Sequence, residues 1–231
     1  MRPSVSHSNW TGLPKSEANN KMKYAMSQRN RNVLVGVCVL GLIIIVWLDH
    51  KFGLKPFPPP LSSEQVKSKD FAKYHNNSFR VTKVIDGDTL DIDIPDGKFN
   101  STRIRLLGVD TPETKDDRFG KMYFGPEATQ FTKQMAINKN FVILLDKISH
   151  TRDKYNRLLA YLKLPNGKIL NEVLVMEGFA YADLRFEHSF YEKYSQLETT
   201  ARQNKKGLWK ESKLAQLPAW LRRMKPELLN D

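Results

Sequence analysis

The chain has 231 residues, 40% of them hydrophobic, which is enough for one domain of ordinary size with extensions. A formal net charge of +12 favours polyanionic partners, either nucleic acid or an anionic membrane surface. The single cysteine, Cys38, excludes an intramolecular disulfide and so disfavours a secreted domain built on disulfides.

The N-terminal part of the chain predicts a membrane anchor. Residues 1–31 are polar, with six basic residues against the single acid Glu17, and we expect a disordered basic tail. Residues 32–48 contain the unbroken apolar run Val33 to Leu48, which as a helix at ~1.5 Å per residue spans about 24 Å of a bilayer. A buried core helix is disfavoured because the run has no polar face. A cleaved signal peptide is disfavoured because no small-residue cleavage site follows.

The excess of basic residues before this run places the N-terminus on the positive-inside face of the membrane and the rest of the chain on the opposite side. Residues 49–74 include a proline-rich stretch from Pro56 to Pro60, which favours an extended spacer. We therefore expect a linker over residues 49–74, a folded domain over residues 75–210 and a C-terminal tail over residues 211–231.

The folded domain begins with strands. Apolar and polar residues alternate over Phe79 to Ile85 and, after an Asp-Gly turn, over Thr89 to Ile94, and Ser101 to Leu107 reads as a third strand. Two further strands are expected over Phe141 to Leu145 and Leu158 to Leu164. Three consecutive hairpin-linked strands predict a small closed sheet. The remaining acids of this stretch are expected in turns or on the solvent face: Asp86, Asp91 and Asp93.

Helices are expected in three places. A helix starts at Gly125-Pro126-Glu127, because proline is favoured in the first helical turn. A short helix is expected over Ile169 to Glu177 and another helix over Phe190 to Lys206, each followed by a glycine that can end it. Two other segments leave alternatives open. The charged stretch Thr114 to Phe124 is either a mobile lid or a solvated loop, and Pro218 to Met224 either packs on the domain or touches a membrane surface.

Acidic residues among the strands are candidate metal ligands. Asp88 and Asp110 can hold a hard cation such as Ca²⁺, to which Thr111 can add a carbonyl or hydroxyl oxygen. Such a cation can polarise a phosphate and hold water. This donor set is suited to cleavage of a phosphodiester, which requires water to be delivered to an anionic phosphorus.

Cleavage also requires a general base and positive charge around the transition state. Glu113 is the nearest spare carboxylate, and it begins a loop after Pro112. Arg105 and Arg157 can each offer paired N–H donors to phosphate oxygens, which a lysine cannot do. Residues two apart in a strand share a face, so Arg105 should lie on the same face as Arg103.

Six segments in chain order resemble the staphylococcal nuclease family: IDGDT, IRLLGVDTPET, YFGPEATQFTKQM, DKYNRLLAY, NEVLVMEGFA and KKGLW. The resemblance covers more than half of the chain, from Phe79 to Trp209. It implies a calcium-dependent nuclease on an OB-fold, a five-stranded β-barrel with about three helices. Carried over position by position, the family's site comprises the calcium ligands Asp88, Asp110 and Thr111, the catalytic residues Arg105, Glu113 and Arg157, and the phosphate contacts Lys154 and Tyr155.

With its N-terminal anchor, the whole chain also resembles fungal, membrane-tethered mitochondrial nucleases of this family. We therefore expect a membrane-anchored endonuclease that hydrolyses DNA or RNA, tethered to a mitochondrial membrane through residues 33–48. The alternative is a non-catalytic OB-fold that binds nucleic acid or protein. The family's tyrosine-rich stretch is here Tyr181 to Phe186, and no base-stacking ring is assigned. The choice between DNA and RNA, the oligomeric state, protein partners, and an endoplasmic reticulum membrane stay open.

Overall fold

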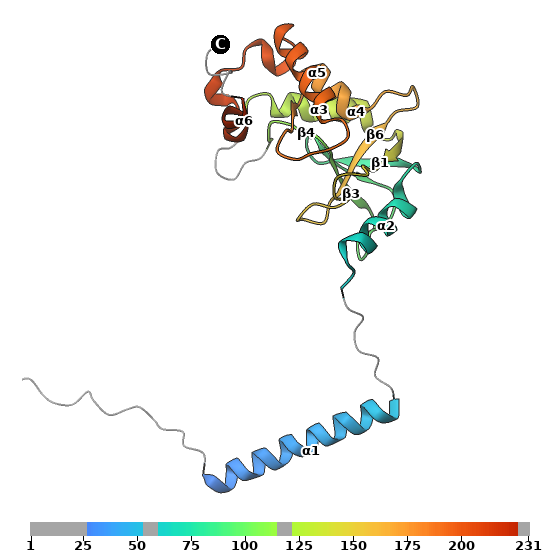
Figure 1. Ribbon diagram of the computed structural model, residues 1–231, viewed down its shortest axis with the longest axis vertical. Coiled ribbons are helices and arrows are strands. Elements are labelled where there is room, and N and C mark those ends of the chain that lie inside the picture. The colour runs from blue at the N-terminus through green and yellow to red at the C-terminus, as the bar shows by residue number, and fades with distance from the viewer. Residues whose placement is uncertain (1–26, 53–59, 115–121, 226–231) are drawn as a thin grey trace, which may run out of the picture. The chain divides into compact units, whose positions relative to one another are not determined.

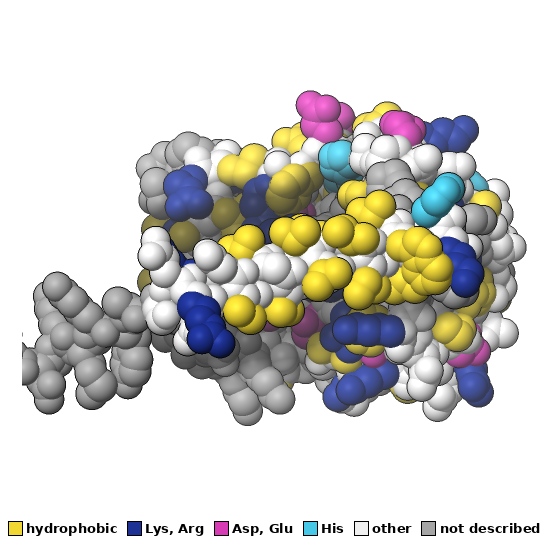
Figure 2. Space-filling view, turned by 90° about the horizontal axis from the view of Figure 1, so that it is seen from below, with side chains coloured by type: hydrophobic (Ala, Val, Ile, Leu, Met, Phe, Trp, Pro, Cys, Tyr) yellow, Lys and Arg dark blue, Asp and Glu magenta, His cyan; other side chains and the backbone are white. Residues whose placement is uncertain are grey.

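A computed structural model describes residues 27–52, 60–114 and 122–225, and the chain forms two units, residues 1–59 and 60–231 (Figure 1). The described part of the first unit is the helix α1 (Gln28–Phe52). Within it, Gln28–Leu48 has a mean hydropathy of 2.4 and is nowhere buried inside the protein, so it is long and apolar enough to cross a membrane. Exposed hydrophobic side chains run along this helix (Figure 2).

The second unit is built around the predicted five-stranded barrel, closed in the order β1-β2-β3-β6-β5. Neighbouring strands are antiparallel except for the parallel pair β3 and β6. An irregularity between Val81 and Lys83 lets β1 pair with β5 through its first residues and with β2 through its last, which closes the barrel. The strands are β1 (Ser78–Val84), β2 (Thr89–Ile92), β3 (Thr102–Leu106), β5 (Asn140–Leu144) and β6 (Leu158–Lys163).

Alternating side chains fill this barrel, as the sequence pattern predicts. In β3, Thr102, Ile104 and Leu106 are buried, whereas Arg103 is exposed and Arg105 is partly buried. Each aliphatic side chain removed from water in this way contributes about 1.5–3 kcal/mol to folding. The core is completed by other fully buried side chains of the barrel strands: Leu90, Ile92, Phe141, Ile143, Leu158 and Leu162.

The three predicted helices are present as α3 (Gly125–Ala136), α4 (Leu170–Met176) and α5 (Tyr191–Gln203). They gather at one end of the barrel, and α2 lies near the other end (Figure 1). A small antiparallel sheet of β4 (Val109–Asp110) and β7 (Tyr181–Ala182) joins the barrel to this helical part.

The structure differs from the expected linker, because residues 63–74 form the helix α2 (Ser63–Tyr74). Ser62 and Gln65 cap its first turn reciprocally, with the Ser62 N–H donating to Gln65 at 2.9 Å. Asp70 and Tyr74 are buried against the barrel. The expected extended spacer is therefore shorter than residues 49–74, and its segment from residue 53 to 59 lies outside the described residues.

The C-terminal segment packs on the domain, which decides between the two alternatives left by its sequence. It contains the 3₁₀ helices η1 (Gly207–Lys210) and η2 (Leu214–Gln216) and the helix α6 (Ala219–Met224). Leu217 and Leu221 are buried in a cluster with Tyr181 and Leu208. Most of the predicted lid or solvated loop, residues 115–121, lies outside the described residues.

Candidate functional site

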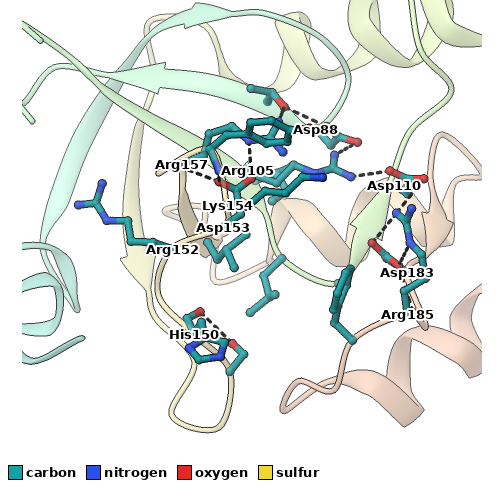
Figure 3. A pocket seen from close by; sticks show the side chains of 18 of the residues that line it. Asp88, Arg105, Asp110, His150, Arg152, Asp153, Lys154, Arg157, Asp183 and Arg185 are labelled. Carbon is teal, nitrogen blue, oxygen red and sulfur yellow. Dashed lines mark hydrogen bonds and ion pairs between the residues drawn. The ribbon is translucent and has the colours of Figure 1, made fainter. Parts of the chain in front are cut away.

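A pocket of about 850 Å³ opens beside β3 and β4 and the loop that precedes β6 (Figure 3). It brings together predicted site residues that are up to 69 positions apart in the sequence, from Asp88 to Arg157. The eighth predicted site residue, Thr111, lies behind the pocket wall and contacts Asp88. The seven predicted site residues that line the pocket are Asp88, Arg105, Asp110, Glu113, Lys154, Tyr155 and Arg157.

Arg105 lies between the two predicted metal-binding carboxylates (Figure 3). Its Nη1 forms an ion pair with Asp88, and its Nη2 donates to Asp110 Oδ1 at 2.5 Å. All three side chains are largely buried. The two carboxylates therefore converge on one positive charge, which compensates the repulsion between them.

Asp88 is fixed by neutral donors as well. Thr111 donates to Asp88 Oδ2 from its backbone N–H at 2.7 Å and from its hydroxyl at 3.0 Å, and Thr89 donates to Oδ1 at 3.1 Å. Gly87 makes this close approach possible, because a Cβ at that position would lie 2.6 Å from Thr111 Oγ1. The absence of a side chain at Gly87 therefore lets Thr111 approach closely enough to bind the Asp88 carboxylate.

The donor set fits a hard cation such as Ca²⁺. Asp88 and Asp110 supply carboxylate oxygens that already face a common cationic partner, and Thr111 supplies further oxygen atoms beside them. The described residues contain no group of three or more His, Cys, Asp or Glu side chains that could hold a metal. A cation here would thus depend on two carboxylates together with threonine or water oxygens.

Arg157 enters the pocket from the residue before β6. Its Nε donates to Asp153 Oδ2 at 2.7 Å, and Asp153 Oδ1 accepts the backbone N–H groups of Tyr155 and Arg157, each at 2.9 Å. β6 runs parallel to β3, with Leu158 opposite Ile104, so Arg157 just before β6 and Arg105 just after Ile104 reach the same pocket from adjacent strands. The DKYNR motif thus forms a turn that is closed by hydrogen bonds to its aspartate, Asp153.

Lys154 and Tyr155 form the rim of the pocket. Tyr155 is 68% exposed, with Lys154 Nζ at 4.9 Å from its ring centroid and the Arg157 guanidinium at 5.4 Å. Glu113 also lines the pocket, three residues after the end of β4, and its side chain is exposed. Its backbone carbonyl accepts the Met122 N–H at 2.9 Å, which holds the start of the loop.

Sequence reasoning missed several residues of this pocket. Asp86, expected in a turn, lines the pocket, and burial raises its pKa although Arg105 and Arg157 act in the opposite direction. Asp183 and Arg185 line it too, and Arg185 pairs with Asp183 Oδ1 at 2.7 Å and with Asp110 Oδ2 at 3.2 Å. The Asp-x-Arg pattern of Asp183 and Arg185 is visible in the sequence, but it is not part of the segments that resemble the family.

Long-range contacts correct the expectation for Asp91 and add one unexpected partner of Asp110. Asp91, expected in a turn or on the solvent face, is buried and accepts from Arg103 Nε at 2.8 Å on the neighbouring strand. Trp220 of α6 donates from Nε1 to Asp110 Oδ2 at 2.9 Å. No local pattern pointed to that contact, because the two residues are 110 positions apart.

Comparison with known proteins adds an independent observation. Residues 103–211 match the family model described as staphylococcal nuclease homologue. The thermonuclease of Staphylococcus hyicus is 35% identical over 174 residues, which cover 75% of this chain and 94% of that protein. The thermonuclease of Staphylococcus intermedius is 35% identical over 153 residues, 66% of this chain and 82% of that protein. An uncharacterized endonuclease of Escherichia coli is 31% identical over 148 residues, 62% and 82% of the two chains.

Proposed function

The chain belongs to the staphylococcal nuclease family, and from this premise we propose that it is a membrane-anchored, calcium-dependent endonuclease that hydrolyses DNA or RNA. The observation that carries the proposal is the convergence of two arginines, two carboxylates and Glu113 in one pocket. Arg105 from β3 and Arg157 from the start of the parallel strand β6 face the same space. A pocket with positive and negative side chains fits an anionic substrate that a water molecule must attack.

The two arginines bind the scissile phosphate. A guanidinium offers a planar fork of N–H donors to two phosphate oxygens while the negative charge develops at phosphorus. Arg157 can offer this fork directly, and Arg105 can do so once a cation takes over its pairing with Asp88 and Asp110. Glu113, exposed on the pocket lining, takes the proton from the attacking water. Lys154 and Tyr155, on the rim, contact a neighbouring phosphate of the same strand.

Asp88, Asp110 and Thr111 would hold the calcium ion. A hard cation at these oxygens would supply polarisation of a phosphate oxygen and orientation of water. The oxygen-only donor set supports this choice over a transition metal. The convergence of both carboxylates on Arg105 supports the position.

A nuclease assay on the full chain in detergent tests the proposal, with Ca²⁺ or chelator, on single- and double-stranded DNA and RNA. Glu113→Gln keeps the shape of the side chain but removes the base, so kcat should fall about 10²–10⁴-fold. Arg105→Lys should also be severe, because lysine lacks the planar fork. Glu64→Gln, on the exposed side of α2, is the control that should leave the rate unchanged.

The alternative is a non-catalytic OB-fold that only binds nucleic acid or protein. It predicts no calcium-dependent cleavage by the parent chain under any of these conditions. If instead the parent cleaves and both Glu113→Gln and Arg105→Lys cleave at the parent rate, the family activity stands but these residue roles are rejected.

The membrane part of the proposal rests on α1. Its apolar stretch meets the length and hydropathy of a single membrane span, and residues 33–48 carry exposed hydrophobic side chains. The basic residues before it place the N-terminus on the positive-inside face and the nuclease domain on the opposite side. We place the anchor in a mitochondrial membrane.

A further inference from the structure

The C-terminal segment reaches the candidate site from beyond the residues that the family model matches. The match to the family model ends at residue 211, and α6 begins at Ala219. Trp220 of this helix nevertheless donates its indole N–H to Asp110 Oδ2 at 2.9 Å. Trp220, beyond the residues that the family model matches, thus contacts the Asp110 carboxylate, which lines the pocket.

The Asp110 carboxylate is held from both of its oxygens. Oδ1 accepts from Arg105 Nη2 at 2.5 Å, whereas Oδ2 accepts from Trp220 and lies 3.2 Å from Arg185 Nη2. The Arg185 guanidinium also lies 4.4 Å from the centroid of the Trp220 ring. Trp220 therefore contacts the carboxylate and packs against the second cation that pairs with it, so rotation of the carboxylate would break both sets of contacts.

A second connection runs through the backbone. Lys225, at the end of α6, forms a buried ion pair with Glu198 of α5. Glu198 Oε1 accepts the N–H of Ala182 at 3.1 Å, and Ala182 in β7 pairs with Val109 in β4, next to Asp110. The segment from Leu214 to Lys225, here called the C-terminal clasp, is thus joined to the strand that carries Asp110 as well as to its side chain.

We propose that Trp220 is a positioning residue for Asp110 and that the C-terminal clasp is part of the nuclease site. This inference rests on the proposed function, because Asp110 acts there as a ligand of Ca²⁺. Ligating carboxylates need outer hydrogen-bond partners to hold their orientation, and loss of such a partner typically weakens metal binding or activity about 10–100-fold. Trp220 is the partner that leaves Oδ1 directed toward Arg105 and Asp88.

The test compares two tryptophans of the same apolar cluster. Trp220→Phe removes the N–H donor and keeps an aromatic ring beside Tyr181. Trp209→Phe is the matched control, because Trp209 Nε1 is buried without a hydrogen-bond partner among the described residues. In the full chain in detergent, calorimetry should show Ca²⁺ affinity about tenfold weaker for Trp220→Phe and about equal to the parent for Trp209→Phe.

The kinetic signature is a higher Ca²⁺ concentration for half-maximal cleavage in Trp220→Phe, with a smaller change in the rate at saturating Ca²⁺. A purely structural role would instead lower the melting temperature and leave the affinity of the folded fraction unchanged. Equal Ca²⁺ affinities for Trp220→Phe and Trp209→Phe would overturn the proposal.

A second measurement does not depend on Trp220→Phe folding. In ¹⁵N-tryptophan-labelled chain, the indole N–H signal of Trp220 should shift when Ca²⁺ is added and in Asp110→Ala, while that of Trp209 stays in place. A Trp220 signal that responds to neither change would overturn the proposal. A parent chain that binds no Ca²⁺ would reject the calcium site of the proposed function, and the response to Asp110→Ala would still decide whether Trp220 holds Asp110.

Discussion

Arg105 is the shared partner of two carboxylates, and this changes what each of them contributes. Asp88 and Asp110 both pair with it in a largely buried setting, where removal of one partner leaves charge uncompensated. From sequence alone, two neighbouring carboxylates without a cation are expected to repel, and replacing one is expected to relieve that repulsion. In the structure, Arg105 already compensates both carboxylates, so replacing one of them does not relieve a repulsion.

We therefore expect Asp88→Asn and Asp110→Asn to weaken Ca²⁺ binding about tenfold or more. Each should also lower the free energy of unfolding measured without Ca²⁺ by about 1–3 kcal/mol, because a buried donor loses its charged partner. Calorimetric titration and urea unfolding measure the two effects. Asp93→Asn is the control, since Asp93 is paired with exposed Arg80 at 3.6 Å and such surface pairs contribute little. A gain in stability in either site variant would contradict the ion pairing.

Asp146 gives the clearest pH dependence. Burial by itself would raise its pKa, but hydrogen bonds from the Ser189 N–H, the Tyr161 hydroxyl and the Ile148 N–H outweigh burial and lower the pKa to about 2. A carboxylate with a lowered pKa contributes stability above its unfolded pKa of about 3.9, and this contribution is lost as the pH falls toward the folded pKa.

Asp146→Asn should therefore be less stable than the parent above about pH 4, and the difference should shrink as the pH falls to about 2. Urea unfolding of both chains across this range measures the difference at each pH. The change keeps the size of the side chain, so packing is matched between the two proteins. A difference that stays constant over the whole range would show that the charge of Asp146 is not what stabilises this loop.

At the scale of elements, α2 contacts the loop that carries part of the candidate site. Asp70 accepts from the Thr151 hydroxyl at 2.7 Å and from Arg152 Nε and Nη2 at 2.9 and 2.6 Å. Arg152 also pairs with Asp96 at 2.5 Å. This buried network holds the start of the loop that carries the DKYNR motif, so the helix belongs to the folded unit and not to the spacer.

Asp70→Asn should destabilise the chain by about 3 kcal/mol, since it breaks one side of a buried ion pair. It should also raise KM more than it lowers kcat, because in the proposed function the loop with Lys154 and Arg157 binds phosphate. Urea unfolding and the nuclease assay measure these effects, with Glu64→Gln on the exposed side of α2 as control. A shortened chain that begins at residue 75 should lose at least as much stability, because it also lacks the buried Tyr74 side chain. Parent-like stability of that shortened chain would contradict a structural role of α2.

At the scale of the whole molecule, α1 and the nuclease domain define the topology. Two glycosylation sequons, Asn76-Asn77-Ser78 and Asn100-Ser101-Thr102, lie in the domain, and both acceptor asparagines are exposed. They would be modified if the domain faced the lumen of the endoplasmic reticulum. In a mitochondrion neither would be modified, so the two locations give opposite results for the same orientation.

We expect no glycosylation, and protection of the nuclease domain from added protease until the enclosing membrane is opened. Gel mobility with and without endoglycosidase, and protease digestion of intact organelles, measure the two properties. A mass shift removed by endoglycosidase would reject the mitochondrial location and keep the orientation. Digestion of the domain in intact organelles would overturn the orientation. Asn76→Gln with Asn100→Gln controls for mobility changes unrelated to glycans.

Much of the architecture follows from patterns within a few residues. The alternation in β3 directs Ile104 and Leu106 inward and Arg105 toward the pocket, and the structure agrees. Pro126 in the first turn of α3 and Gly178 after α4, with φ of 72°, mark helix ends where they were expected. These features depend on backbone geometry and on side-chain period, which neighbouring residues determine by themselves. The segments that resemble the family likewise identified pocket residues, because each segment holds its site residues within a few positions of one another.

Tertiary structure alone decided the contacts between distant residues. No pattern near Asp70 predicts its contact with Arg152, 82 positions away. No pattern near Asp110 predicts its contact with Trp220, 110 positions away. The sequence of α2 is too polar to predict a packed helix, and the burial of Asp91 depends on Arg103 lying opposite it across β2 and β3. Charged side chains become buried only where the fold supplies a partner, because an unpaired charge costs too much to remove from water.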